Sequence, residues 1–571
     1  MGRAGSLSVY ARRELADCSD SSPALLLEGD WPSELRSSAR HSLDDLFDVR
    51  HAWIDVEAAR LAEVLAERGL AAGRKGWLPW LDNLKLRYFL VRLVRVVAYF
   101  AERQELGHVR FHSSGPRDAD YALLLAEICQ QRGIELEVHR HGNEPARRPP
   151  AMPANPPHRQ LAGRLAAFWG SWPLRQRFDA SAPRVLLCGN PSLLDPLCSG
   201  LVAQGSRVAW LWDRFPLKWW RTWRGRVEPL VCDAANGKQN GMRIDTWGPI
   251  DCRGFDLAEP VRHWLGIRAE SYGAWQTRLV ERIERHLDRF RPSVLVLDED
   301  STPTARAAVA VAREQGIGSI VLQHGAPCVR FGYSPLAADR ICVWGEASRQ
   351  RFIDWGVPAE RIRVTGSPKH DELLHGQPTA RTAATKGLRV LVLGTLPPED
   401  DRPDSVALHF TSETHRGMLR AAFGGLGGIA GVQIVLKLHP RLASDQVFWE
   451  TLAEFPPLNA QFVRGGDLAA MVSDCDVVLS CASSAGLEAA WWGRPVIEIL
   501  PIGSEVPFPA ALWGQVGMAR TGDEVASLVA QCRAPHEVVP SPLVFANLER
   551  PAVEAILEEI AELAGTPLRQ V

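Results

Sequence analysis

Residues 293–325 read SVLVLDEDSTPTARAAVAVAREQGIGSIVLQHG, and they contain two short apolar runs that each end in polar residues. The runs VLVL and IVL are apolar at every position, so both faces of each predicted strand are apolar. Parallel strands that helices cover on both sides have this composition. Strand-like runs alternate with helical patterns along almost the whole chain, and this alternation predicts the α/β class.

The alternation falls into three series along the chain. Residues 1–150 contain a βαβ-like unit, and a Pro-rich stretch at Asn143–His158 follows as a predicted linker. Residues 159–375 and 387–545 each predict a doubly wound Rossmann-like domain, and a helix is expected at 546–571. Ligands of such sheets bind beyond the carboxyl ends of the strands, so we expect the two domains to face each other across a cleft.

The composition of the 571 residues is that of a folded protein, with 46% hydrophobic and 23% charged residues. The formal net charge of −2 gives no general attraction to nucleic acid, so no such partner is expected. The 11 cysteines show no CxxC or zinc spacing, which indicates reduced thiols and a cytoplasmic location. No apolar run reaches about 18 residues, and no signal peptide or transmembrane helix is expected.

Two segments of the sequence are compatible with a peripheral contact with the inner membrane. Leu86–Glu102 is apolar but is interrupted by Arg87, Arg92 and Arg95 at near-helical spacing. It fits either an amphipathic core helix or a basic helix on an anionic membrane surface. Asp213–Arg226 mixes tryptophans with Lys and Arg, which suits a lipid headgroup region, a sugar or phosphate acceptor, or a packed loop.

The strand Val435–Arg441, VLKLHPR, is the first candidate for anion binding. Its apolar run ends in Lys437, His439 and Arg441, which place two permanent cations around a histidine. Thr395 follows the strand LRVLVLG of the same series and is assigned to the same edge of the predicted sheet. These side chains at a carboxyl edge predict a phosphate site.

A second loop at that edge, Ser480–Glu488, follows the strand DVVLS and opens a helix. Ser483 or Ser484 suits the N-cap, and a helix N-terminus offers free N–H groups and a partial positive charge to a phosphate. Capping alone explains the serines, but their combination with the cationic strand predicts phosphate binding. Glu488 lies one helical turn after Ser484 and fits either a ribose diol or a solvated helix surface.

Three adjacent carboxylates, Asp298, Glu299 and Asp300, end the apolar run VLVL. Carboxylates at the end of a buried strand are costly unless they are solvated, paired or used in chemistry. One of them is therefore a candidate general base with a raised pKa. The spacing of Asp298 and Asp300 also fits Mg²⁺ or Mn²⁺ holding a diphosphate, but the cationic strand makes a metal redundant, and we expect none.

The next strand ends in Gln323, His324 and Gly325 at the same edge as the carboxylates. His324 is interpreted as a base, an acceptor contact or a phosphate ligand, and the alternative is a structural histidine bonded to the backbone. Gly366–Pro368 turn the chain toward the next series, so we interpret them as an interdomain hinge.

The motifs KLHPR and DVVLSCASSAGLEAAWWGRPVIEI resemble the C-terminal half of bacterial surface-polysaccharide glycosyltransferases of GT-B fold. The resemblance is closest to capsule and O-antigen transferases that use CMP-Kdo, and it covers roughly Val294–Pro501. It extends more weakly to bacterial sialyltransferases, whose acidic, HP and SS motifs are matched by 298–300, 439–440 and 483–484. The LQHG and KLHP pair is similar to CDP-glycerol glycerophosphotransferases.

This resemblance implies a cytidine-nucleotide donor held by residues 387–545, an acceptor side at 159–375, and neither metal nor cofactor beyond the CMP-sugar co-substrate. It implies that His439, Ser483 and Ser484 bind the donor phosphate and that the acidic cluster supplies the catalytic carboxylate. The sialyltransferase acidic motif ends in glycine, whereas Ser301 stands here, so the choice of carboxylate stays open.

The expected activity is transfer of an acidic sugar, Kdo or a related nonulosonic acid, from a CMP donor to a bacterial capsule, O-antigen or lipopolysaccharide acceptor. Three alternatives stay open: a CDP-glycerol-type polyol phosphotransferase with His324 as base, a UDP-sugar 2-epimerase-like isomerase, and a non-enzymatic glycan- or nucleotide-binding component. We expect Glu299 or Asp300 to act as the base in an inverting transfer, or as the nucleophile in a retaining one.

Overall fold

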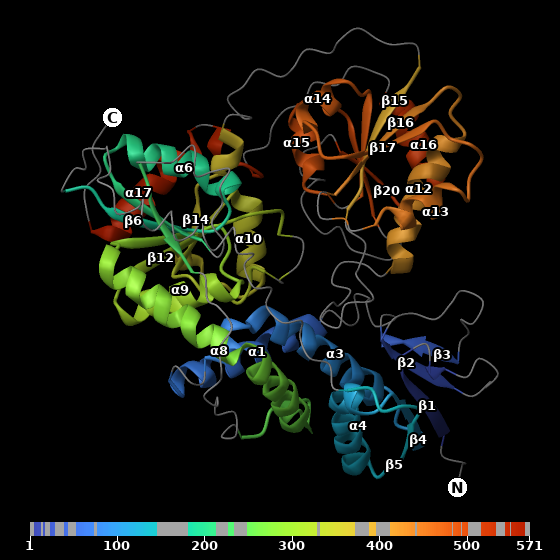
Figure 1. Ribbon diagram of the computed structural model, residues 1–571. Coiled ribbons are helices and arrows are strands. Elements are labelled where there is room, and N and C mark those ends of the chain that lie inside the picture. The colour runs from blue at the N-terminus through green and yellow to red at the C-terminus, as the bar shows by residue number, and fades with distance from the viewer. Residues whose placement is uncertain are drawn as a thin grey trace.

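The structure, a computed structural model, contains three separate parallel sheets with helices packed on them (Figure 1). It describes residues 5–12, 15–16, 23–28, 39–43, 53–73, 77–145, 181–212, 226–232, 248–327, 330, 332–371, 387–395, 412–439, 442, 444–481, 483–492, 494–500, 516–532, 543–548 and 550–565. Within these residues the strands β9 (Asp251–Cys252) and β10 (Phe255–Asp256) form the one antiparallel pair.

The middle sheet has the strand order β14-β13-β12-β11-β6-β7-β8. Its strands are β6 (Arg184–Cys188), β7 (Arg207–Trp212), β8 (Glu228–Val231), β11 (Val294–Leu297), β12 (Gly318–Leu322), β13 (Arg340–Val343) and β14 (Ile362–Val364). Helices α6 (Pro191–Ala203) and α17 (Ala552–Ala564) cover one face, and α9 (Pro303–Glu314) and the second half of α8 (Ala258–Phe290) cover the other. The short helices α10 (Glu346–Asp354), η7 (Ala359–Arg361) and η8 (Pro368–His370) follow β13 and β14.

Strand β11 shows why this sheet is covered on both sides. Val294 and Val296 belong to the core under α6 and α17, while Leu295 and Leu297 belong to the core under α8 and α9. All four side chains are fully buried. The predicted parallel strand with two apolar faces is therefore confirmed.

The C-terminal sheet has the strand order β17-β16-β15-β18-β19-β20. Its strands are β15 (Arg389–Leu393), β16 (Gln433–Leu438), β17 (Ala460–Arg464), β18 (Val477–Ser480), β19 (Val496–Ile499) and β20 (Val516–Ala519). One face packs on α12 (Ser412–Gly427), α13 (Gln446–Leu452) and α16 (Gly522–Gln531), and the other on α14 (Leu468–Ser473) and α15 (Ala485–Trp491). The expected class, GT-B-like α/β with two doubly wound Rossmann-like domains and an N-terminal α/β region, is confirmed.

The N-terminal region forms a third sheet, with the order β3-β2-β1-β4-β5. Its strands are β1 (Gly5–Arg12), β2 (Ala24–Glu28), β3 (Arg40–Ser42), β4 (Leu106–Ser113) and β5 (Glu135–Arg140), and its helices are α1 (Trp53–Ala71), α2 (Leu78–Leu81), α3 (Asn83–Ala101), η6 (Pro116–Asp118) and α4 (Ala119–Arg132). Helix α8 joins this region to the middle sheet, because its first half packs with α4 and its second half packs under β11.

Helix α3 corresponds to the apolar segment that the sequence left open between a core helix and a membrane-surface helix. Arg87 and Arg95 are only 2% and 3% exposed, and most of the other side chains of α3 are buried as well. The core-helix interpretation is confirmed for this segment. The Trp-rich stretch at 213–225 lies outside the described residues.

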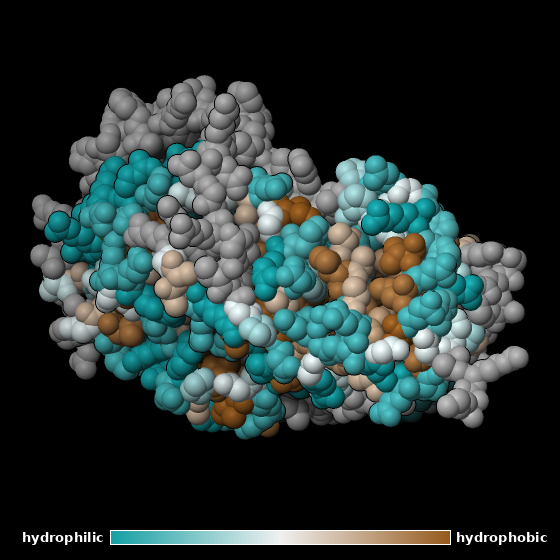
Figure 2. Space-filling model, turned by 90° about the horizontal axis from the view of Figure 1, so that it is seen from below, coloured by the Kyte–Doolittle hydropathy of each residue, from teal (hydrophilic) through white to brown (hydrophobic). Residues whose placement is uncertain are grey.

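None of the helices that the structure describes combines the length and apolar character needed to span a membrane. Figure 2 shows the molecule from below. Hydrophilic residues cover most of the described surface on this side, and the exposed apolar residues lie in separate groups.

The chain end returns to the middle sheet. Residues of α17 pack under that sheet, and a Cβ on Gly318 would lie 2.5 Å from Leu563 Cγ, so the helix lies directly against β12. The Asp371 carboxylate accepts hydrogen bonds from the amides of Ala552 (2.8 Å) and Val553 (3.0 Å) at the start of α17. Short helix η10 (Ala546–Leu548) precedes α17, and Ala546 N–H donates to Trp344 O at 2.7 Å.

Candidate functional site

The strand orders place a topological switch point in each of the two doubly wound sheets. In the middle sheet β6 lies between β7 and β11, and in the C-terminal sheet β15 lies between β16 and β18. At such a point the connections leave in opposite directions, and ligands bind beyond the strand carboxyl ends. The candidate residues follow these strands or their direct neighbours.

Asp298 lies at the switch point of the middle sheet, directly after β11. Its Oδ2 accepts a hydrogen bond from Asn190 N–H at 2.7 Å, in the turn that follows β6. A Cβ on Gly189 would lie 1.7 Å from Asp298 Oδ1, so only glycine leaves room for this carboxylate. Burial raises the pKa of Asp298 to about 6, with the charge of Glu299 adding to the effect and the Asn190 amide opposing it. A carboxyl with such a pKa changes protonation near neutral pH, as a general base requires.

The contacts of Asp300 and Glu299 differ from those of Asp298. Asp300 is 3% exposed, and its Oδ2 accepts the amides of Ala337 (2.6 Å) and Ala338 (3.0 Å), so it holds the segment before β13. Burial raises the pKa of Asp300 as well. Glu299 accepts a hydrogen bond from Ser301 Oγ at 2.7 Å. The structure therefore gives Asp300 a structural role and leaves Asp298 as the better candidate base.

His324 is exposed at the carboxyl end of β12, next to β11. Its ring stacks on Tyr333 with the centroids 4.5 Å apart and the planes at 9°. Gln323 is buried and fixes the turn, because its Oε1 accepts Trp344 N–H at 2.9 Å and its Nε2 donates to Gly325 O at 2.9 Å. The exposed imidazole is thus held beside the acidic residues by a rigid turn.

Strand β16 turns its one cationic side chain, Lys437, toward the face that α14 and α15 cover. The alternation of buried and half-buried residues places Ile434, Leu436 and Leu438 in the core under α12, so Lys437 lies on the opposite face. His439 follows the strand with the same alternation and is half-buried. The side chains on that face, including Leu393 of β15, form one core with Trp344 and Phe545, which lie beside the middle sheet. Arg441 lies outside the described residues.

The loop from Ser480 to Ser484 lies on the other side of β15. Lys437 and Ser480 are both in register with Leu393, so the two segments stand two strand spacings, about 10 Å, apart. Ser480 Oγ donates to Ser483 O (3.2 Å) and accepts Ser483 N–H (3.3 Å), which closes the loop. Thr395 lies between the two segments. It follows Gly394, whose N–H donates a hydrogen bond to Lys437 O.

The two candidate serines differ in their contacts. Ser484 is exposed and precedes α15, but its side chain makes no capping hydrogen bond. Ser483 Oγ accepts Ala485 N–H at 3.4 Å, which is a long contact. The expected N-cap is therefore not formed by Ser484, whose exposed hydroxyl stands at the edge of the sheet beside β15.

Glu488 joins the C-terminal sheet to the middle one. Its Oε1 accepts Lys369 Nζ at 2.8 Å and contacts His370 Nε2 at 3.2 Å, both from η8. Burial acts to raise the pKa of Glu488, but the His370 hydrogen bond and the Lys369 charge outweigh it and lower the pKa to about 2. The solvated-helix interpretation is wrong, because this side chain is 17% exposed and ion-paired. A ribose contact would have to share this carboxylate with Lys369.

Four residues that contribute to these edges were not found from the sequence. Gly189 and Asn190 shape the position of Asp298, and Lys369 pairs with Glu488 from 119 residues away. His415 in α12 is fully buried against the backbone of Thr395, and burial lowers its pKa to about 4. A glycine directly after an apolar strand is the one signal that marked residue 189 in advance.

No protein-family model and no curated protein matches the chain. Among solved structures, it is similar to a putative UDP-N-acetylglucosamine 2-epimerase from Listeria monocytogenes, at 12% identity and a TM-score of 0.43, over 67% of this chain and 97% of that one. It is similar to a UDP-GlcNAc 2-epimerase from Methanocaldococcus jannaschii, at 13% identity and 0.43, over 66% and 99%. MurG from Acinetobacter baumannii follows at 13% and 0.39, over 66% and 100%. At these TM-scores the likeness carries no argument about activity.

Proposed function

We propose that the protein is a glycosyltransferase of GT-B type that moves a sugar from a nucleotide donor to a glycan. The observation that carries the proposal is a division of charge between two switch points. Asp298, with a pKa raised to about 6, stands at one, and Lys437 and His439 stand beside the other. Transfer of a sugar requires both a base for the acceptor hydroxyl and a counter-charge for the phosphate leaving group.

The donor side is assigned to Lys437, His439, Ser483 and Ser484, with Thr395 between them. The bond from the sugar carbon to the phosphate oxygen breaks, and negative charge grows on the phosphate. Lys437 supplies a permanent positive charge for it, and the histidine and the hydroxyls supply directional donors. No metal or other cofactor is needed in this scheme, because the cation of β16 takes that part.

The acceptor side is assigned to the middle sheet. The acceptor oxygen forms the new bond to the sugar carbon, and its proton passes to Asp298 in an inverting transfer. Asp298 is bound by one oxygen to Asn190 N–H, and the hydrogen bond holds the carboxylate in a fixed orientation. Glu299 and His324 flank it at the same edge and are the next candidates to contact the acceptor.

We propose CMP-Kdo or a related CMP-nonulosonic acid as the donor, and a bacterial capsule, O-antigen or lipopolysaccharide chain as the acceptor. The support is the sequence pattern KLHP followed by SS, together with the position of both motifs on either side of β15. A cytoplasmic location, with the acceptor presented at the inner membrane, is part of the proposal. The nine cysteines that the structure describes are free thiols, as cytoplasmic proteins have them.

The direct test incubates the purified protein with CMP-Kdo, CMP-N-acetylneuraminate, UDP-GlcNAc or CDP-glycerol, each with and without bacterial surface oligosaccharides. We expect CMP release that depends on the oligosaccharide and a product longer by one acidic sugar. Conversion of UDP-GlcNAc to its epimer without any acceptor would replace the proposal with an isomerase. Transfer of glycerol phosphate from CDP-glycerol, lost in the His324→Ala variant, would replace it with a phosphotransferase.

A further inference from the structure

The N-terminal sheet has a switch point of its own, which the proposed reaction does not use. Strand β1 lies between β2 and β4, so the connections leave in opposite directions at its carboxyl end. Arg12 is the last residue of β1, and the loop Ser113–Asp118 follows β4. Ligand groups gather at this position in open parallel sheets.

A rigid backbone frames this position. Gly115 has φ +100°, and a Cβ there would lie 2.8 Å from Gly142 O, so only glycine lets the two chain segments pass. Glu144 N–H donates to Ser114 O at 2.9 Å, and Arg117 N–H donates to Glu144 O at 3.2 Å. The buried Asp118 Oδ2 accepts Ser114 N–H at 2.6 Å and fixes the loop after β4.

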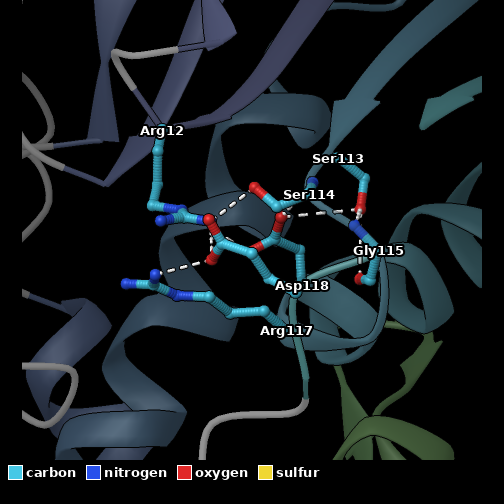
Figure 3. A network of polar contacts seen from close by, with 7 residues as sticks. Arg12, Ser113, Ser114, Gly115, Arg117 and Asp118 are labelled. Carbon is cyan, nitrogen blue, oxygen red and sulfur yellow. Dashed lines mark hydrogen bonds and ion pairs between the residues drawn. The ribbon is translucent and has the colours of Figure 1, made fainter. Parts of the chain in front are cut away.

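Two arginines from different elements converge on one carboxylate within this frame. Glu144 Oε2 accepts Arg12 Nη2 at 2.9 Å and Arg117 Nη1 at 2.7 Å. Arg12 Nη2 also donates to Ser114 Oγ. In Figure 3 both guanidinium groups lie on the side of the network opposite Ser113 and Gly115. Two arginines that donate to one carboxylate oxygen form an arrangement that recognises a carboxylate or a phosphate, and Ser114 Oγ lies beside it as a second polar group that contacts Arg12.

Glu144 is the replaceable member of the cluster. Its side chain is 48% exposed, whereas that of Asp118 is 1% exposed. The Arg117 and Arg12 hydrogen bonds lower the pKa of Glu144, so it is ionised at neutral pH. Arg12 Nε also lies 3.9 Å from Asp118 Oδ1, so the buried Asp118 carboxylate keeps Arg12 in position when Glu144 moves away. An exposed carboxylate held by two arginines is what a ligand anion would displace.

Aromatic rings lie on the strands that lead to Arg12 and Ser114. His112 precedes Ser113 in β4, and its ring stacks with Tyr10 (4.4 Å), His139 (5.0 Å) and His141 (5.1 Å). Flat rings next to a few fixed polar groups are typical of sites for small organic ligands. This neighbourhood favours an anion attached to a sugar over a bare ion.

We propose that Arg12, Ser114 and Arg117 form an anion-binding site of the N-terminal domain for a carboxylate- or phosphate-bearing sugar, in which Glu144 competes with the ligand. The site is separate from the donor and acceptor edges described above. The inference therefore does not depend on the proposed transferase activity.

Isothermal titration of the full chain with inorganic phosphate, glucuronate and glucose tests this site. Glu144→Gln removes the competing charge from an exposed side chain, so we expect phosphate and glucuronate to bind about 5- to 10-fold more tightly than to the wild type. Glu135→Gln, exposed at the opposite, amino end of β5, is the matched control and should leave the affinity unchanged. Adding Arg12→Gln to Glu144→Gln should lower the affinity by at least about tenfold.

The three probes separate the sources of the anion. Tighter binding of glucuronate than of phosphate identifies an acidic sugar, and tighter binding of phosphate identifies a phosphate group. An unchanged affinity in Glu144→Gln, or equal gains with glucose, would overturn the proposal. The stabilisation of these variants by CMP should stay that of the wild type, so failure at this site and failure of the transferase proposal are distinguishable.

Discussion

The carboxyl edges of the middle and C-terminal sheets share one topology but carry opposite chemistry. In each, the first strand of the domain lies at the switch point, β6 in one and β15 in the other. The strand beside β6 is followed by Asp298, and the strand beside β15 carries Lys437 and is followed by His439. Strand order therefore decides where functional groups gather, while the residues after each strand decide which part of a reaction that edge performs.

The largest expected effect on activity comes from replacing Asp298, the acidic residue at the edge of the middle sheet. Asp298→Asn keeps the shape and the contact to Asn190 N–H but removes the base, so we expect kcat/KM to fall by about 10²- to 10⁴-fold. In the wild type kcat/KM should rise through pH 6 and level off above it, because the base must be ionised. Steady-state kinetics from pH 4.5 to 8.5 measure both.

Asp288→Asn is the matched control for that variant. Asp288 lies on α8, where its Oδ1 accepts a hydrogen bond from Gln315 on the surface, so its replacement should leave kcat/KM unchanged. If Asp298→Asn kept more than a tenth of the activity, the base would lie elsewhere, and Glu299 would be the next residue to replace.

Lys437→Ala removes the positive charge at the edge of the C-terminal sheet. We expect kcat/KM for the CMP-sugar to fall by about 10- to 100-fold in this variant. The control is Arg416→Gln on α12, which pairs with Glu450 on the opposite side of the C-terminal sheet. An equal loss in both variants would show a general charge effect and contradict a local phosphate site.

Asp298 should also lower the free energy of unfolding at neutral pH. Burial raises the pKa of Asp298 from the ordinary 3.8 to about 6 in the folded protein, so the free-energy penalty is absent below pH 3.8, grows between pH 3.8 and pH 6 and is complete above pH 6. Asp298→Asn should therefore unfold at higher urea concentration at pH 7.5, with a gain on the order of 2 kcal/mol, and should show no gain at pH 3.5. A variant less stable than the wild type at pH 7.5 would contradict the assigned desolvation.

The smallest effect concerns the link between the two edges. Glu488→Gln should lower the free energy of unfolding by about 1 kcal/mol at pH 7, since Lys369 is half-exposed and solvent weakens the pair. The Glu488 pKa is lowered to about 2, so the difference should persist above pH 4.5 and shrink as pH falls toward 2. Glu346→Gln, in an exposed pair with Arg349, is the control and should change little.

Local patterns predicted the strands and the residues after them, because side-chain periodicity and apolar runs are properties of neighbouring residues. The four buried residues of β11 and the alternation of β16 follow from this. Local patterns could not predict the partners of these residues, because the topology brings the partners together from distant parts of the chain. Asp298 meets Asn190 across 108 residues, and Asp300 meets Ala337 across 37, which separated a candidate base from a structural carboxylate.

The most direct test of the account compares two histidines from opposite edges in one nucleotide-binding measurement. Thermal unfolding is followed with CMP, CDP, UDP, GDP and ADP for the wild type, His439→Ala and His324→Ala. A nucleotide at a hundred times its Kd should stabilise the wild type by about 2.7 kcal/mol, and we expect CMP to act most strongly. His439→Ala should lose this stabilisation while His324→Ala keeps it. Full stabilisation of His439→Ala by CMP would contradict a donor phosphate site at the end of β16.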